Sequence, residues 1–279
     1  MPVVQVEVAA EDAELAADAL WAAGPSAVVE EVLPGGLVRL TADVAEPGSL
    51  DRRWPMRVLE EAEDAGLDGW RTWAQPHRAG RRLVLQPAWQ DAGDADPRDL
   101  VVPIDPGRAF GSGSHPSTRS VAAVLEGRVT GGERVLDVGC GSGVLSVVAC
   151  RLGAAEAVAV DLAPEAVVAT EANASANGVR DRVRASLTPV EEVVGPFDLV
   201  VANIGLAVLR DLAVPLAAQV ADDGVLVLAG LLDAQVDDVL GAYPDWRAVE
   251  VRSESGWSTL VLSRAIRRGG ATGSPPAPP

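Results

Sequence analysis

Three glycines at alternate positions follow a short apolar run, and an acid stands just before them. The stretch from Val135 to Gly143 reads Val-Leu-Asp-Val-Gly-Cys-Gly-Ser-Gly, with Asp137 near the end of the apolar run and Gly139 as the first glycine. Glycines permit a tight turn and let a ligand contact the backbone, and the helix expected next offers free N–H groups at its start. The pattern therefore predicts a nucleotide-binding turn.

A second acid lies at the distance that such a site needs. The next apolar run covers residues 157–160 and ends in Asp161, where a carboxylate can accept hydrogen bonds from both ribose hydroxyls of an adenosine. Dinucleotide sites usually read Gly-x-Gly-x-x-Gly, whereas this turn reads Gly-x-Gly-x-Gly after an acid. That pattern resembles the first motif of class I S-adenosylmethionine-dependent methyltransferases.

The elements that must position these residues alternate between strand and helix from residue 133 onward. We expect strands over 134–138, 157–160, 183–187, 197–202 and 225–229, helices over 144–152, 164–177, 206–220 and 234–243, and two final strands over 247–252 and 259–263. Pro215 should interrupt or kink the third of these helices. Five βα units closed by an antiparallel hairpin predict an α/β fold, a Rossmann-like doubly wound sheet. The hairpin favours a class I methyltransferase over a dehydrogenase.

Polar residues stand at the ends of three expected strands. Gly139 follows the first strand, Asp161 follows the second, and Asn203 follows the fourth. Ligands bind to open parallel sheets at the carboxyl ends of the strands. We therefore assign the three positions to one crevice; the alternative for Asn203 is a residue that merely forms a turn.

The first 74 residues predict a separate small unit. A strand over 3–8, a helix over 13–23, a hairpin over 27–41, a helix that begins at Pro55 and runs to about residue 65, and a strand over 70–74 give the order βαββαβ of a ferredoxin-like α+β domain. We expect a substrate-recognition domain at 1–74, a connector at 75–104, a methyltransferase domain at 105–266 and a disordered tail at 267–279. The alternative for residues 1–74 is a structural appendage.

A loop rich in glycine, proline and serine precedes the glycine turn. It reads Asp-Pro-Gly-Arg-Ala-Phe-Gly-Ser-Gly-Ser-His-Pro-Ser-Thr from Asp105 to Thr118, and a helix over 118–125 should follow it. Long loops in compact domains are usually functional or disordered. His115 is either a general base or a residue that fixes the loop by a hydrogen bond. We favour the second role, because no acid partner is near it in the sequence.

Composition excludes several classes of function. The 279 residues carry a net charge of −17, and every basic residue among them is arginine or histidine. Such acidity argues against broad binding to nucleic-acid backbones. No apolar run is long enough to cross a membrane, and the N-terminus lacks the pattern of a signal peptide, so we expect a cytoplasmic protein. Cys140 and Cys150 do not form a Cys-x-x-Cys pair, and we expect no metal site.

Several stretches together resemble the bacterial methyltransferase family of large-subunit ribosomal protein L-eleven (L11). They are the loop from Asp105 to Thr118, Val135-Leu-Asp-Val-Gly-Cys-Gly-Ser-Gly-Val-Leu-Ser146, Val201-Ala-Asn-Ile204 and Leu85-Gln-Pro-Ala-Trp89. The resemblance implies S-adenosylmethionine as cofactor, with contacts from Thr118, Gly139, Asp161 and Asn203. It also implies N-methylation of lysine ε-amines of that ribosomal protein, with the N-terminal α-amine as a further candidate acceptor.

Chemistry suggests a role for Asn203 and leaves other substrates open. The Asn203 carbonyl can orient a neutral amine by accepting its N–H, which makes this residue our catalytic candidate. The family usually reads Leu-Ala where Gly205 and Leu206 stand, so methylation of another protein or a small amine is an alternative. A nucleic-acid methyltransferase and a binding-only sensor of S-adenosylmethionine are more distant ones.

Overall fold

The computed structural model describes the chain in eight stretches. They cover residues 3–9, 12–21, 28–44, 47–49, 53–59, 74–90, 96–107 and 109–265. Their strands form a four-stranded, a three-stranded and a seven-stranded sheet. No helix among these residues is long and apolar enough to cross a membrane.

The largest sheet contains seven strands in the order β10-β9-β8-β11-β12-β14-β13. Their bounds are β8 (Arg134–Val138), β9 (Glu156–Val160), β10 (Val183–Ser186), β11 (Phe197–Asn203), β12 (Val220–Leu232), β13 (Trp246–Glu254) and β14 (Trp257–Arg264). The five strands from β10 to β12 are parallel, whereas β14 is antiparallel to both of its neighbours. The expected doubly wound sheet with a C-terminal antiparallel hairpin is therefore confirmed.

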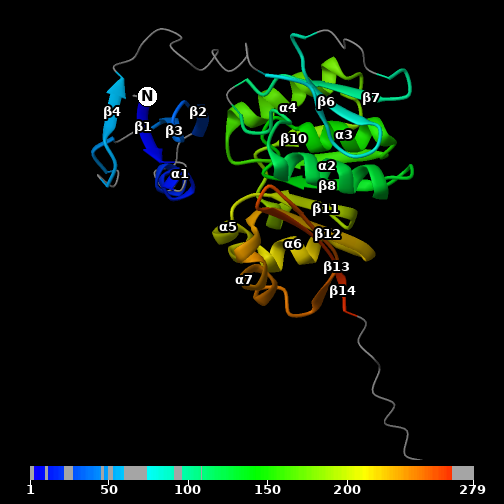
Figure 1. Ribbon diagram of the computed structural model, residues 1–279. Coiled ribbons are helices and arrows are strands. Elements are labelled where there is room, and N and C mark those ends of the chain that lie inside the picture. Colours follow the sequence, from blue (N-terminus) through cyan, green and yellow to red (C-terminus); the bar gives the residue numbers. More distant parts are fainter. Residues whose placement is uncertain are drawn as a thin grey trace, which may run out of the picture.

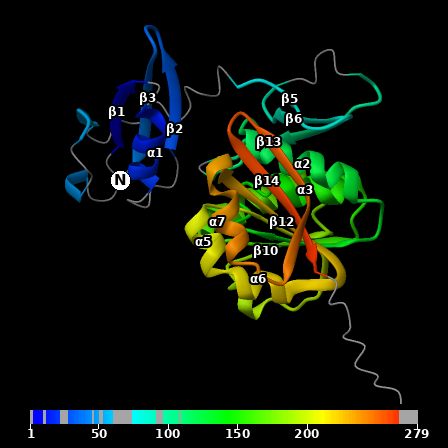
Figure 2. The same ribbon diagram turned by 60° about the horizontal axis from the view of Figure 1, so that its bottom comes forward.

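Helices cover both faces of this sheet, as Figures 1 and 2 show. One face carries α2 (Pro116–Arg128), α3 (Val144–Leu152) and α4 (Pro164–Ala176), and the other carries α5 (Leu206–Asp211), α6 (Ala213–Gln219) and α7 (Val236–Gly241). Alternate residues of each central strand enter opposite cores. In β11, Val201 packs toward α2 and α3, whereas Val200 and Ala202 pack toward the opposite helices. Burial on both faces explains why these strands are continuous apolar runs.

The prediction of a break at Pro215 was wrong by three residues. The chain leaves α5 and enters α6 at Leu212, which ends one helix and precedes the other. Pro215 lies in the first turn of α6, where the missing N–H has no intrahelical acceptor to lose. Proline here is compatible with the start of a second helix.

The three-stranded sheet lies against the helices of the first face. It consists of β5 (His77–Arg78), β6 (Leu83–Pro87) and β7 (Leu100–Ile104). Leu83, Leu85, Val102 and Ile104 are buried in the same core as residues of α2 and α3. Because β7 leads directly into the loop from Asp105, this packing fixes the start of that loop.

The four-stranded sheet has its own core. Its elements are β1 (Val3–Ala9), α1 (Ala13–Trp21), β2 (Val28–Leu33), β3 (Leu37–Asp43), a short 3-10 helix (Pro47–Ser49) and β4 (Met56–Leu59). The strand order is β2-β3-β1-β4, and every neighbouring pair is antiparallel. Since β3 lies between β1 and β2, the β1–α1–β2 segment is a split βαβ unit. Val4, Val6 and Val8 pack against Ala16 and Leu20 of the helix.

The prediction of a helix over 55–65 was wrong where the structure describes the chain. Residues 56–59 form β4, with Met56 opposite Val6 and Val58 opposite Val4. The exposure of these residues does not alternate, because Met56 is partly buried whereas Arg57 and Val58 are both exposed, so the pairing with β1 and not the local pattern makes the strand. The free edge of β1 supplies the partner. Residues 60–65 and 70–73 lie outside the described residues, so the second helix and last strand of the expected ferredoxin-like order are not shown.

Candidate functional site

The turn after β8 adopts a backbone that only glycine accepts readily. Gly139, Gly141 and Gly143 have φ values of 73°, 53° and 75°, all in the left-handed region. A Cβ atom on Gly139 would lie 2.4 Å from Cγ2 of Ile204, and one on Gly141 would lie 2.5 Å from the carbonyl oxygen of Phe110. Glycine at these positions therefore permits both the turn and the close approach of two other segments.

Asp161 faces this turn from the end of β9. Its Oδ2 accepts the N–H of Gly141 at 2.9 Å, and its Oδ1 accepts the N–H of Ala163 at 3.0 Å. The next residue, Leu162, is 90% exposed. A partly exposed carboxylate beside an exposed apolar side chain can bind a ribose and offer a surface to an aromatic base.

Asn203 is the last residue of β11, and only one of its two side-chain polar atoms has a hydrogen-bond partner. Its Nδ2 donates to Oγ1 of Thr118 at 3.4 Å, whereas its Oδ1 is buried and has no hydrogen-bond partner. A buried acceptor without a donor costs roughly 1–3 kcal/mol. The arrangement fits a ligand that brings an N–H group to this oxygen.

The four positions predicted from the sequence come together. Thr118 contacts Asn203 directly, and Ile204, the next residue, lies against Gly139. Asp161 joins the same turn through Gly141. They lie around the carboxyl ends of three neighbouring strands. The structure thus places the four positions close together, while the shared crevice and their roles as ligand contacts stay predictions.

The loop before α2 is bonded to the glycine turn. Ser142 donates its N–H to the carbonyl of Phe110 at 2.8 Å and its hydroxyl to the carbonyl of Gly111 at 2.7 Å. Asn173, buried on α4, bonds both backbone groups of Asp105 and the carbonyl of Ser142. Ser142 and Asn173 were not singled out from the sequence. For Asn173 the signal was a polar residue among the buried positions of α4.

His115 fixes the start of α2. Its Nδ1 accepts the N–H of Ser117 at 3.2 Å, and its ring packs edge-on against Phe110 and Trp257 at centroid distances of 5.5 and 4.6 Å. Burial lowers the pKa of His115 to about 4, so the ring is neutral near pH 7. The geometry supports the loop-fixing role over the general base. It also moves the helix start from the expected residue 118 to Pro116.

Asp137 lies beneath the turn and is fully buried. Its Oδ2 accepts the N–H and the hydroxyl of Ser146 at 3.2 and 2.8 Å. Burial raises the pKa of Asp137 from 3.8 to about 6, although both hydrogen bonds oppose the shift. The carboxylate therefore anchors the first turn of α3, and its burial lowers the folding stability by an amount that depends on pH.

We predict that Asp137→Asn gains stability relative to wild type as the pH rises from 4 to 7. Between these pH values the Asp137 carboxyl holds a proton in the folded protein that it has lost in the unfolded chain. The unfolding free energy of the wild type therefore falls as the pH rises, by about 2–3 kcal/mol for this group. Urea unfolding at four pH values measures the difference. Asp233, whose pKa is lowered by the hydroxyls of Ser258 and Ser253, provides the control: its contribution to stability is lost only below about pH 4, so Asp233→Asn should show almost no change relative to wild type between pH 4 and 7. A difference independent of pH would contradict the prediction.

Gly230 is a residue that sequence reasoning missed. It lies in β12 with φ of 83°, and a Cβ atom there would lie 2.7 Å from the carbonyl oxygen of Ile204. The pairing of β12 with β14 shifts register between Leu228 and Leu231. A glycine inside an apolar strand pattern signals such a bulge or close backbone approach. Gly230 thus allows the Asn203–Ile204 turn to sit against β12.

Metal and thiol chemistry have little support at this site. Within the described stretches, no group of three His, Cys, Asp or Glu side chains is arranged to hold a metal ion. Cys140 and Cys150 are free and buried. Burial raises the pKa of both thiols, that of Cys150 to about 11, so neither ionises near pH 7.

A solved structure shares this architecture. The ribosomal protein L11 methylase of Lactobacillus delbrueckii subsp. bulgaricus superimposes with a TM-score of 0.64 at 30% identity, covering 68% of this chain and 99% of that one. The sheet order, the glycine turn and the C-terminal hairpin thus define a class I methyltransferase-like α/β fold.

Sequence comparisons narrow the class to a family. The family model described as ribosomal protein L11 methyltransferase (PrmA) matches residues 38–265. Relatives with that name in Cupriavidus metallidurans and Cupriavidus necator are 45% and 46% identical over 192 and 195 residues, or 68% and 69% of this chain. The chain belongs to the ribosomal protein L11 methyltransferase family. It spans 61% and 63% of the length of these two relatives.

Proposed function

We propose that the chain is an S-adenosylmethionine-dependent N-methyltransferase that acts on lysine ε-amines of ribosomal protein L11. The N-terminal α-amine of that protein is a further candidate acceptor. The unpartnered Asn203 Oδ1 carries the proposal, because an amine nucleophile would provide the missing N–H donor. Family membership supports the substrate.

The residues of the crevice fit the cofactor. Asp161 would hold the ribose hydroxyls, the left-handed turn at Gly139 would let the methionine part approach the backbone, and Thr118 would tie the preceding loop to the site. When bound, S-adenosylmethionine supplies an electrophilic methyl group on a sulfonium. The chain's own contribution is alignment of two reactants and exclusion of water.

The acceptor must lose a proton before it can attack. A lysine amine ordinarily titrates near about 10.4, and transfer into an apolar, glycine-lined crevice lowers that pKa. Asn203 Oδ1 would then accept one N–H and so orient the nitrogen lone pair toward the methyl group. His115 cannot serve as the base here, since its Nδ1 is occupied by the N–H of Ser117 and its ring is largely buried.

We further propose that the unit in residues 1–74 recognises the protein substrate, and that the reaction takes place in the cytoplasm. The described part of this unit has a core separate from those of the large sheet. A net charge of −17 also favours approach of a cationic, lysine-bearing surface.

The proposed function is tested with purified protein, labelled S-adenosylmethionine and unmethylated L11. Mass spectrometry should place methyl groups on lysines or on the N-terminal amine of L11. Label on another protein or a small amine would identify a different substrate, an alternative that Gly205 and Leu206 leave open because the family usually reads Leu-Ala there. Cofactor binding without any labelled acceptor would indicate a sensor.

We predict that Gly230→Ala lowers both stability and turnover. The substitution combines a left-handed backbone with a clash against Ile204, and should cost roughly 2–3 kcal/mol of unfolding free energy. Displacement of Asn203 should reduce kcat as well. Gly178→Ala is the matched control, since its φ is 67° but a Cβ there meets nothing within 4 Å. If urea unfolding shows the same loss of unfolding free energy for both variants, the contact with Ile204 is unimportant.

A further inference from the structure

The loop that covers the glycine turn is held on two sides. On the first side, Ser142 bonds the carbonyls of Phe110 and Gly111, as described above. On the second side, the ring of His115 packs against Trp257, the first residue of β14. The C-terminal hairpin therefore takes part in placing the loop, although it is separated from it by more than 130 residues.

Arg119 links the loop, the helix and the hairpin through one side chain. Its guanidinium donates to the carbonyl of Ser114 and to the carboxylate of Glu254, with Nε 3.0 Å from Oε1. The Arg119 side chain is only 17% exposed. It follows Thr118 directly, so the same helical turn contacts Asn203 and bonds the loop.

We propose that Arg119 is a positioning residue for cofactor binding. By joining the Ser114 carbonyl to the Glu254 carboxylate, its guanidinium holds the loop 109–115 against the glycine turn. The inference rests on the proposed function, because the loop and the turn together form the cofactor crevice. A planar fork that serves two acceptors suits arginine and is poorly replaced by lysine.

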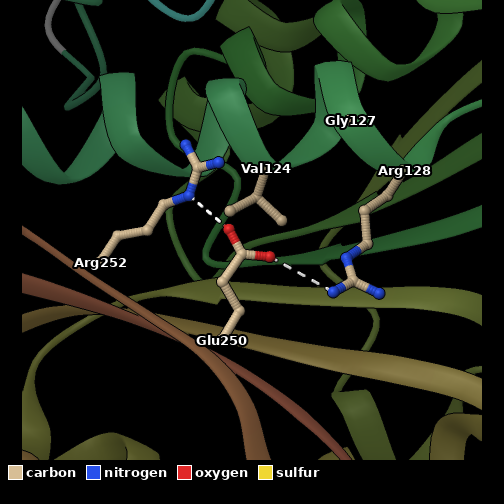
Figure 3. A pocket seen from close by; sticks show the side chains of 5 residues that line it. All are labelled: Val124, Gly127, Arg128, Glu250 and Arg252. Carbon is tan, nitrogen blue, oxygen red and sulfur yellow. Dashed lines mark hydrogen bonds and ion pairs between the residues drawn. The ribbon is translucent and has the colours of Figure 1, made fainter.

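A second charged cluster already holds α2 against β13. Arg128 of the same helix bonds Glu250 of the same strand at 3.3 Å. Figure 3 shows this pair, with Arg252 on the other oxygen of the Glu250 carboxylate. This cluster lines a pocket between the two elements, with Val124 and Gly127. Within the described stretches, none of these five residues is hydrogen-bonded to the loop. What Arg119 adds is its bond to Ser114.

The test compares Arg119→Gln with Arg128→Gln in the full chain. Each variant removes one ion pair between α2 and β13, so both should lower Tm, Arg119→Gln by more because it also loses the bond to Ser114. Titration calorimetry with S-adenosylmethionine should show a Kd raised about tenfold in Arg119→Gln and unchanged in Arg128→Gln. The KM for the cofactor should rise in parallel, while kcat at saturating cofactor stays within about twofold of wild type.

Further variants separate positioning from folding. Arg119→Lys keeps the charge and should recover part of the affinity, with a Kd between those of wild type and Arg119→Gln. Equal Kd values for wild type, Arg119→Gln and Arg119→Lys would overturn the inference. If Arg119→Gln does not fold, the Kd of Arg119→Lys alone tests the inference, and a wild-type Kd in that variant overturns the inference. Failure of the wild-type chain to bind S-adenosylmethionine would instead refute the proposed function, and this inference with it.

Discussion

Replacing Asn203 with alanine should lower kcat by roughly 100- to 1000-fold, because a preorganised acceptor at the reacting amine is lost. The Kd for S-adenosylmethionine should change much less. The acceptor in question is Oδ1, which is buried and has no hydrogen-bond partner. An amine that enters the crevice without this oxygen keeps its freedom to rotate, so the nitrogen lone pair is seldom aligned with the methyl group.

The same substitution should leave stability nearly unchanged. Asn203 makes one long hydrogen bond, 3.4 Å from Nδ2 to Thr118 Oγ1, and its other polar atom is unsatisfied. Removing both groups costs at most about 1 kcal/mol. A buried acceptor without a donor lowers the stability of the fold. Such unfavourable local arrangements concentrate at functional sites.

A buried asparagine with satisfied bonds provides the matched control for this prediction. Asn177 donates through Nδ2 to the carbonyls of Pro103 and Asn173. Asn177→Ala should therefore lower Tm, yet leave kcat at saturating substrates unchanged. Single-turnover rates with enzyme in excess over L11 measure the chemical step for both variants. Wild-type turnover by Asn203→Ala with unchanged cofactor affinity would refute the proposed role of Asn203.

The sequence was informative where local pattern decides structure. Apolar runs that end in Val138, Val160 and Asn203, each followed by helical patterns, led to the parallel sheet and to the crevice at its carboxyl edge. Buried parallel strands need long apolar runs, and the left-handed turn needs glycine, so both can be recognised in the sequence.

The misses arose where tertiary contacts override local pattern. Residues 56–59 are too few to distinguish a helix from a strand by period, and the free edge of β1 decides for a strand. The start of α2 was missed because histidine is an unusual N-cap residue, which acts here through an unprotonated Nδ1 that accepts the N–H of Ser117.

Contacts between distant segments left no local signal at all. Ser142 meets Phe110 across about thirty residues, and Arg119 meets Glu254 across 135. The orphan oxygen of Asn203 is likewise a property of its surroundings, since an asparagine after a strand more often forms a turn. The sequence could therefore supply the members of the site but not the loop's attachments.

Replacing Asp161 with alanine should raise the Kd for S-adenosylmethionine about 100-fold, since two charge-assisted hydrogen bonds to the ribose hydroxyls would be lost. In the described structure both carboxylate oxygens accept backbone N–H groups, from Gly141 at 2.9 Å and from Ala163 at 3.0 Å. Each oxygen keeps further lone pairs for a ribose. The carboxylate therefore shapes the turn and binds the ligand at once.

The experiment must separate these two roles. Asp198 accepts the N–H of Arg134 at 2.8 Å, at the amino ends of β11 and β8 and thus at the opposite edge of the sheet from Asp161. Asp198→Ala removes a comparable carboxylate–backbone bond without touching the crevice, so it should lower Tm and leave the Kd unchanged. Calorimetry on both variants decides the matter. If Asp161→Ala and Asp198→Ala show the same small change in Kd, Asp161 only supports the turn and the ribose lies elsewhere.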